Sequence, residues 1–146
     1  MQTIQTKTLQ LLSKLNWLPP LLARLTTGIV FAESGWGKLQ NLERVTSYFT
    51  SLGIPFAEIQ APFVAGLELV GGLLLIFGLF TRVWALLLSG VMGVALVTAK
   101  LQDVSTPTDI LGFVEFLYLI LLIDLFVRGP GRIALDALFK KTSITS

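Results

Sequence analysis

Four long apolar stretches dominate this chain and restrict the folds that it can adopt. They run over about residues 20–38, 60–80, 82–100 and 109–127. A helix needs about 20 mainly apolar residues to cross the hydrocarbon core of a bilayer. Only 14% of the residues are charged, against about 25% in an average soluble domain. The sequence therefore predicts an all-α integral membrane four-helix bundle that forms a single domain over residues 1–146.

Amphipathic segments are predicted at both ends of this bundle. Residues 1–18 repeat leucines at helical spacing, which is typical of a helix lying along the membrane surface, and Pro19 and Pro20 then begin the first span. A second interfacial segment is predicted over residues 130–141. A cleaved signal peptide is the competing interpretation of the N-terminus, but Arg24 interrupts its apolar core.

The connections between the spans also carry structural signals. Residues 39–60 predict a short helix followed by a turn around Gly53 and Pro55. The second and third spans are joined almost directly at Thr81 and Arg82, which favours an antiparallel hairpin.

Lysine and arginine are distributed unevenly between the two sides of the predicted bundle. Three of the 11 lie on the side opposite the termini, namely Lys38, Arg44 and Lys100. The other eight are Lys7, Lys14, Arg24, Arg82, Arg128, Arg132, Lys140 and Lys141. Cytoplasmic loops carry the excess of positive charge. We therefore predict a multi-pass protein of the cell (inner) membrane with both termini in the cytoplasm.

The chain contains no cysteine and no histidine. These absences exclude a disulfide, a thiol-exchange pair and a histidine-ligated zinc or haem site within it. No metal site is predicted. A redox role would need a diffusible cofactor such as a quinone, or a partner subunit. The net charge of +2 is too small to indicate a nucleic-acid partner.

Two glutamates interrupt the apolar stretches and are the candidate catalytic residues. Glu68 lies in the second span and Glu115 in the last. A carboxylate inside a spanning helix costs about 2.5 to 3.5 kcal/mol, so it usually faces a partner, a cavity or a pathway. At about 1.5 Å per residue, Glu68 lies roughly 10 Å below the outer boundary, near which Lys38 also lies. Glu115 lies a little shallower than Glu68. All three residues therefore lie in the outer half of the bilayer, which predicts an outward-opening polar pocket there.

A stripe of residues along the first span is predicted to face the other helices. Arg24, Gly28, Phe31, Gly35 and Lys38 follow one another at steps of four and three. Small residues allow close approach between membrane helices, and Gly71 and Gly72 share a face with Glu68 in the second span. The candidate substrate-binding residues are Lys38, Arg24 and Trp36, and Trp36 also suits an interface anchor. Arg24 and Asp124 match in depth, which allows a pair between them.

Each of these charges also has a structural interpretation. Glu68 and Glu115 can be hydrogen-bonded packing residues, and Lys38 and Arg24 can extend to the headgroups. Asp124 can instead pair with Arg128, one turn away. Glu33 faces away from the stripe, and Arg132 with Asp136 suits a surface pair.

The order of these residues resembles the DoxX family of small membrane proteins over nearly the whole chain. The resemblance lies in Arg24 through Lys38 in the first span, Glu68 with its glycines in the second, Glu115 in the fourth and the ending at Gly129-Pro130-Gly131. Ala134 stands where a serine is usual. The residues to which a structural role is assigned are Gly28, Gly35, Gly71, Gly72, Gly129, Pro130, Gly131 and Asp136.

The resemblance implies a four-helix membrane bundle and redox relatives. These include the membrane subunit of a thiosulfate-quinone oxidoreductase and subunits of oxidative-stress complexes. The family's recurring charged positions match Arg24, Lys38, Glu68 and Glu115. Because the chain has no cysteine, a disulfide-exchange mechanism cannot be carried over.

Two hypotheses of function follow. The first is an oxidoreductase subunit that binds a quinone or a small reductant in an outer pocket, working with a soluble or membrane oxidoreductase partner. Glu68 and Glu115 would carry protons there, and Lys38 would hold a carbonyl or an anion. The second is a non-catalytic assembly or anchoring protein that recruits a soluble partner. A transporter is disfavoured, because four helices enclose little space unless the chain forms a homo-oligomer.

Overall fold

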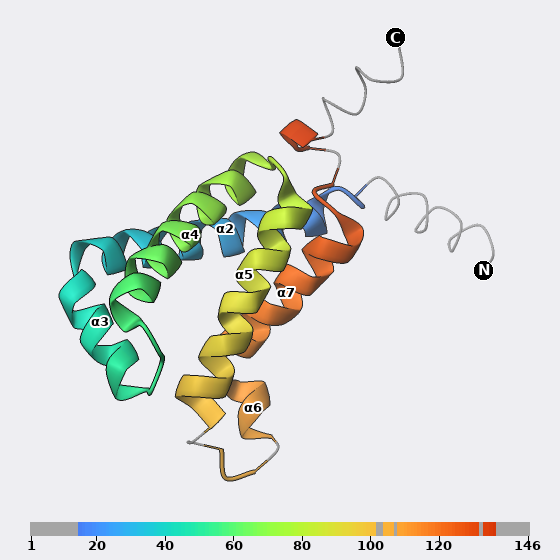
Figure 1. Cartoon of the computed structure of the whole chain (residues 1–146). Coiled ribbons are helices and arrows are strands. Elements are labelled where there is room, and N and C mark those ends of the chain that lie inside the picture. Colours follow the sequence, from blue (N-terminus) through green and yellow to red (C-terminus); the bar gives the residue numbers. More distant parts are fainter. Residues whose placement is uncertain (1–14, 102–103, 107, 132, 137–146) are drawn as a thin grey trace, which may run out of the picture.

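The computed structural model describes residues 15–101, 104–106, 108–131 and 133–136, and all the regular structure in these ranges is helical (Figure 1). The all-α prediction is confirmed. The helices are α2 (Leu18–Gln40), α3 (Leu42–Ser51), α4 (Ala57–Phe77), α5 (Thr81–Ala95), the π-helical turn η1 (Leu96–Lys100) that continues α5, α6 (Asp109–Gly112) and α7 (Val114–Arg128). Most of the predicted interfacial helix (residues 1–14) and most of the tail (132 and 137–141) lie outside the described residues.

Two of the described helices are long and apolar enough to cross a membrane. They are Ala57–Phe77 and the continuous helix Thr81–Lys100, which correspond to the predicted second and third spans. α4 ends before the predicted boundary because Gly78 adopts a left-handed conformation with φ of 71°. The Gly78 and Leu79 N–H groups donate to carbonyls of the last helical turn, which closes the helix end.

The fourth predicted span is divided by the structure into two helices. Phe113 has an extended backbone, with ψ of 131°, between α6 and α7. Gly112, just before it, is a poor helix former, and the Lys100 ammonium lies 5.6 Å from the centre of the Phe113 ring. The continuous span over residues 109–127 is therefore wrong at this point, and Glu115 lies in the first turn of α7.

α2 and α4 pack tightly because three glycines lie between them. A Cβ atom at Gly35 would collide with the backbone of Leu69 and Ala65, and one at Gly72 would collide with Ala32. A Cβ at Gly28 would lie 2.9 Å from the Gly72 carbonyl oxygen. The backbones of the two helices consequently touch along the stripe that the sequence predicts, as small residues permit in membranes.

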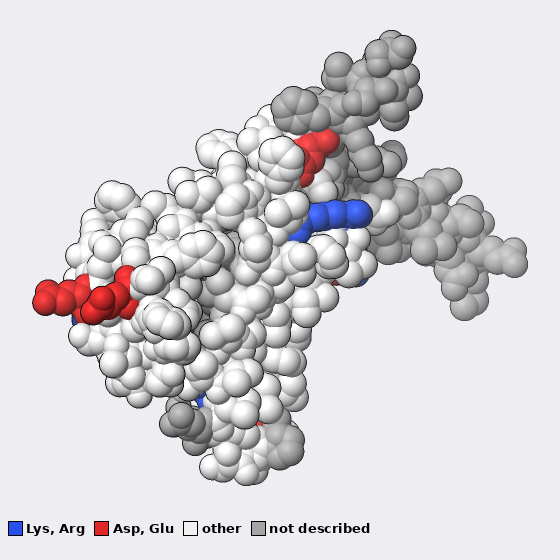
Figure 2. Space-filling model, viewed as in Figure 1, with Lys and Arg blue, Asp and Glu red and all other residues white. Residues whose placement is uncertain are grey.

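α5 packs along α7 and completes the arrangement (Figure 1). Leu75, Leu88, Leu122 and Leu125 are fully buried between the helices. The Phe31 and Tyr118 rings meet edge to face with centroids 6.1 Å apart, which links α2 to α7. Charged side chains gather at the ends of the face in Figure 2, and the broad surface between them is uncharged.

The segment after α7, residues 129–131 and 133–136, ties one end of the molecule together, and we call it the C-terminal strap. Arg24 of α2 donates to the Pro130 carbonyl (3.1 Å) and the Ile133 carbonyl (2.7 Å). The Asp136 carboxylate accepts hydrogen bonds from the N–H groups of Phe80 (2.8 Å) and Thr81 (2.9 Å) at the start of α5. The strap thereby joins α2, α5 and the end of α7.

Candidate functional site

A part-buried ion pair connects α2 and α4. The Lys38 Nζ donates to both carboxylate oxygens of Glu68, each at 2.6 Å, and the Ser34 hydroxyl donates to Glu68 Oε2 at 2.9 Å. Glu68 is 0% exposed, whereas the Lys38 side chain is 28% exposed. Ser34 and Lys38 are four residues apart on one face of α2, so a single helix face holds the carboxylate.

The close approach of the two helices explains why these groups can meet. Gly35 lies between Ser34 and Lys38 and contacts the backbone of Leu69, next to Glu68. A larger residue at position 35 would push α2 away from α4. Lys38 also lies in the last turn of α2, where the helix dipole favours a cation.

A second ion pair lies across from the first. The Lys100 Nζ is 3.5 Å from Glu115 Oε1, with side chains 35% and 28% exposed. The Lys100 ammonium also contacts the Phe113 ring. Lys100 is the last residue of η1, and π-helical turns occur frequently at functional sites.

Two cavities adjoin these charges. The larger, about 710 Å³, lies among α3, α4, α5 and η1, and the smaller, about 240 Å³, lies among α2, α4, α5 and α7. Five residues line both of them: Lys38, Glu68, Met92, Ala95 and Glu115. Ligand sites in proteins commonly measure about 300–1,000 Å³ and are mostly apolar with a few polar groups. The larger cavity has this size and character.

The apolar wall of the large cavity comes from three helices. Phe49 of α3 and Leu52 directly after it line the cavity, together with Val64 and Leu67 of α4 and Val91 of α5. Arg44 and Tyr48 of α3 and Gln60 in the first turn of α4 also line it. Lys38, Glu68, Lys100 and Glu115 are the other charged residues of the lining, so the cavity combines a long apolar surface with a few charged groups.

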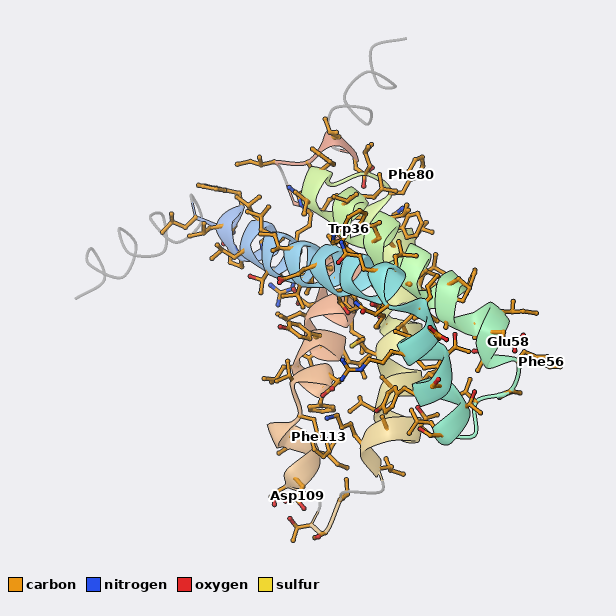
Figure 3. All side chains as sticks on the ribbon, turned by 90° about the vertical axis from the view of Figure 1, so that its left-hand side faces the viewer. Trp36, Phe56, Glu58, Phe80, Asp109 and Phe113 are labelled. Atoms are coloured by element: carbon orange, nitrogen blue, oxygen red, sulfur yellow. The ribbon has the colours of Figure 1, made fainter. Side chains whose placement is uncertain are left out.

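The structure brings together three of the predicted site residues and leaves two elsewhere. Lys38, Glu68 and Glu115 line both cavities. Trp36 lines neither cavity and is 56% exposed on the outside of α2 (Figure 3). Arg24 is buried at the strap, where two carbonyls hold its guanidinium.

Of the two partners that the sequence allows for Asp124, the structure has Arg128 and not Arg24. Asp124 Oδ1 lies 2.7 Å from Arg128 Nε, one turn along α7. Carbonyl oxygens of the strap provide the hydrogen bonds of Arg24 instead. Matching depth in two spans does not decide between a side-chain partner and a main-chain partner.

Sequence-based prediction missed Ser34, Lys100 and Tyr118. Ser34 could have been found, because it precedes Lys38 by one helical turn. Lys100 lies at the end of the third span, but the π-helical turn that carries it changes the helical register. Tyr118 lines the small cavity one turn after Glu115 and packs on Phe31.

No group of three or more acidic, cysteine or histidine side chains that could hold a metal ion occurs among the described residues. The charged residues that line the large cavity are Lys38, Arg44, Lys100, Glu68 and Glu115. Ammonium groups can donate hydrogen bonds to a carbonyl, and carboxylates can accept and release protons.

Comparison with known proteins gives the context of this site. The DoxX family model matches residues 20–101. The chain is 38% identical to "Putative oxidoreductase CatD" of Bacillus subtilis over 118 residues, which are 80% of this chain and 83% of that protein. It is 33% identical to "Inner membrane protein YqjF" of Escherichia coli over 135 residues, 89% of this chain and 98% of that protein. "Inner membrane protein YphA" of Escherichia coli is 26% identical over 80% of this chain and 86% of that protein. No solved structure matches the chain.

Proposed function

Because this chain belongs to the DoxX family of membrane proteins, we propose that it is a membrane subunit of an oxidoreductase that binds a quinone or a small reductant in the large cavity. The observation that carries the proposal is the part-buried Lys38–Glu68 ion pair in the wall of that cavity. The name of the Bacillus subtilis relative, "Putative oxidoreductase CatD", agrees with the proposal.

The cost of burying this pair supports a functional role. Removing a charge from water is expensive, and Glu68 is 0% exposed while the Lys38 side chain is 28% exposed. Replacing a buried pair by apolar residues is often neutral or stabilising. An ion pair beside a cavity therefore suggests a use beyond packing. Membrane-embedded ionisable residues commonly mark substrate and proton pathways.

Each charged group suits one part of quinone chemistry. An ammonium has three donors, and Lys38 uses two on Glu68, so the third is available to a quinone carbonyl. Reduction of a quinone to a quinol takes up two electrons and two protons. Glu68 and Glu115 would relay the protons. The electrons would come from a small reductant or a partner subunit, because the chain has no cysteine or histidine.

The proposal includes a four-span topology with both termini in the cytoplasm. The start of α2, the α4–α5 turn and the strap lie at one end of the molecule, and Phe80 and Asp109 lie at opposite ends in Figure 3. The uncharged band in Figure 2 suits a lipid environment. The large cavity would then open in the outer half of the bilayer, with Trp36 as an interface anchor.

Single-cysteine labelling tests this topology without a background signal, because the native chain has no cysteine. In intact cells, a membrane-impermeant maleimide should label Ser47→Cys in α3 but not Thr142→Cys. Labelling of Thr142→Cys from outside would invert the proposed orientation.

The proposed activity is tested on protein purified with its native lipids. Bound quinone would be assayed first, and electron transfer would then be compared between wild type and Glu68→Gln. Glu33→Gln is the matched control, because Glu33 is an exposed carboxylate on α2. We expect at least a tenfold loss for Glu68→Gln and no loss for the control. Unchanged turnover in a folded Glu68→Gln protein would remove Glu68 from the mechanism.

A second candidate function is a non-catalytic assembly or anchoring protein that recruits a soluble partner. The observation that favours it is the complete pairing of Glu68, which accepts from both Lys38 and Ser34. A tagged copy should then co-purify with a soluble enzyme. If the tagged protein co-purifies with a soluble enzyme but carries no bound quinone, the assembly function is favoured over the first.

A further inference from the structure

We infer that the ligand of the large cavity is a quinone with a long apolar tail that enters sideways from the bilayer, between α4 and α5. This inference rests on the proposed function and narrows it, because it selects a lipid-soluble ligand over a water-soluble reductant. The opening is formed by Phe63 of α4 and by Leu87, Gly90 and Val94 of α5, and we call these four residues the portal.

The portal residues have two properties at once. All four line the large cavity. All four are also exposed on the surface, with Phe63 65%, Leu87 42% and Val94 54% exposed. A residue that lines a cavity and lies on the outer surface marks the place where the cavity reaches that surface. The large cavity therefore opens between the two helices.

The packing of α4 and α5 explains why an opening forms here. The helices touch near their connecting turn, where a Cβ atom at Gly71 would lie 2.9 Å from the Trp84 ring. They diverge away from that turn (Figure 1), and the cavity separates them at the level of the portal. The main packing partner of α4 is α2, and that of α5 is α7.

Gly90 keeps the middle of the portal open. A Cβ atom at this position would have no heavy atom within 4 Å. Close packing therefore does not require a glycine here, although a glycine within a helix costs about 1 kcal/mol relative to alanine. Because Gly90 lines the cavity and is exposed, a larger side chain at position 90 would narrow the opening.

The chemistry along the cavity matches an amphipathic ligand. The portal is apolar, Leu67 and Val91 continue the apolar lining, and the Lys38–Glu68 pair also lines the cavity. A tail can rest in the portal while the quinone ring meets Lys38. A water-soluble reductant would instead use the part of the lining that Arg44, Tyr48 and Gln60 form.

The test compares two ligands in reconstituted vesicles of wild-type protein, Gly90→Leu and Gly93→Leu. Gly93 is a matched control, because it lies on α5, has equally open surroundings and does not line the cavity. The probes are a quinone with an isoprenoid tail and the same quinone without a tail. Binding is followed by quenching of the chain's tryptophan fluorescence. We expect Gly90→Leu to slow binding of the tailed quinone at least tenfold and to change the binding rate of the tail-less quinone less than twofold. Gly93→Leu should change neither binding rate.

Other outcomes distinguish a failure of the portal from a failure of the proposed function. If the wild type binds neither quinone, the proposed function fails. If the wild type binds both and Gly90→Leu leaves tailed-quinone binding unchanged, or slows both equally, the portal is wrong and the proposed function stands. Phe63→Ala supplies a second measurement, since shortening this exposed side chain should speed access of the tailed quinone. An unchanged or slower rate in a folded Phe63→Ala protein would also contradict the portal.

Discussion

Replacing Lys38 with methionine tests how strongly the part-buried ion pair holds α2 against α4. The variant loses both hydrogen bonds of 2.6 Å and leaves Glu68, which is 0% exposed, with only the Ser34 hydroxyl. Breaking a buried pair from one side costs about 3–5 kcal/mol. Glu68→Gln should lower the free energy of unfolding by less, about 1–3 kcal/mol, because Lys38 is 28% exposed and its ammonium still reaches water.

The free energy of unfolding would be measured by titration with sodium dodecyl sulfate in mixed micelles, followed by far-UV circular dichroism. The double variant Lys38→Met/Glu68→Gln completes the cycle, and its cost should fall short of the sum of the single costs by about 2 kcal/mol. Lys100→Met is the control, because its ion pair with Glu115 is longer and partly exposed and is worth less than about 1 kcal/mol. If Lys38→Met costs no more than Lys100→Met, or the single costs simply add, the pair is not what holds the two helices.

Three further predictions follow from contacts elsewhere in the chain. Gly35→Ala should lower the free energy of unfolding by about 1–3 kcal/mol in the same titration, whereas Gly37→Ala should not, because a Cβ meets nothing within 4 Å there. Asp136→Asn should lower the free energy of unfolding by about 1 kcal/mol, because it weakens two hydrogen bonds to backbone N–H groups at the start of α5. The variant should also speed proteolysis of the strap. Equal proteolysis rates in the variant and the wild type would contradict this role of Asp136. Hydrogen bonds from the Thr106 backbone and side chain and from the Ser105 backbone lower the pKa of Asp109. The pKa of Asp109 is lower in the folded than in the unfolded state, so its hydrogen bonds with Ser105 and Thr106 should be fully formed above a pH of about 4 and weaken as the pH falls further. We expect amide exchange at Thr106 to become faster as the pH falls. Asp109→Asn should produce the same faster exchange at neutral pH.

The helix faces could be predicted from the sequence because helical spacing is fixed. Steps of three and four residues placed Gly28, Gly35 and Lys38 on one face of the first span, and the structure has them on the side of α2 that meets α4. Counting residues along the spans placed Lys38, Glu68 and Glu115 in the outer half of the bilayer, and in the structure all three line the same two cavities. These expectations depend only on backbone geometry.

The partners of the charges could not be predicted in the same way. Arg24 binds main-chain carbonyls, which every residue type carries, so no pattern of side chains points to Pro130 and Ile133. The Lys100–Glu115 pair depends on a π-helical turn and on the break at Phe113. Hydropathy is insensitive to both features, because neither changes the apolar character of the stretch.

The C-terminal strap also has a consequence for biosynthesis. Ribosomes add about 5–20 residues per second, so Arg24 is made several seconds before the carbonyls of Pro130 and Ile133 that hold it. During that interval the first helix carries a guanidinium that lacks its final partners. The hydrogen bonds between Arg24 and the strap can therefore form only near the end of translation. A chain truncated after Arg128 would contain every described helix and would still leave the arginine of its first one unpaired.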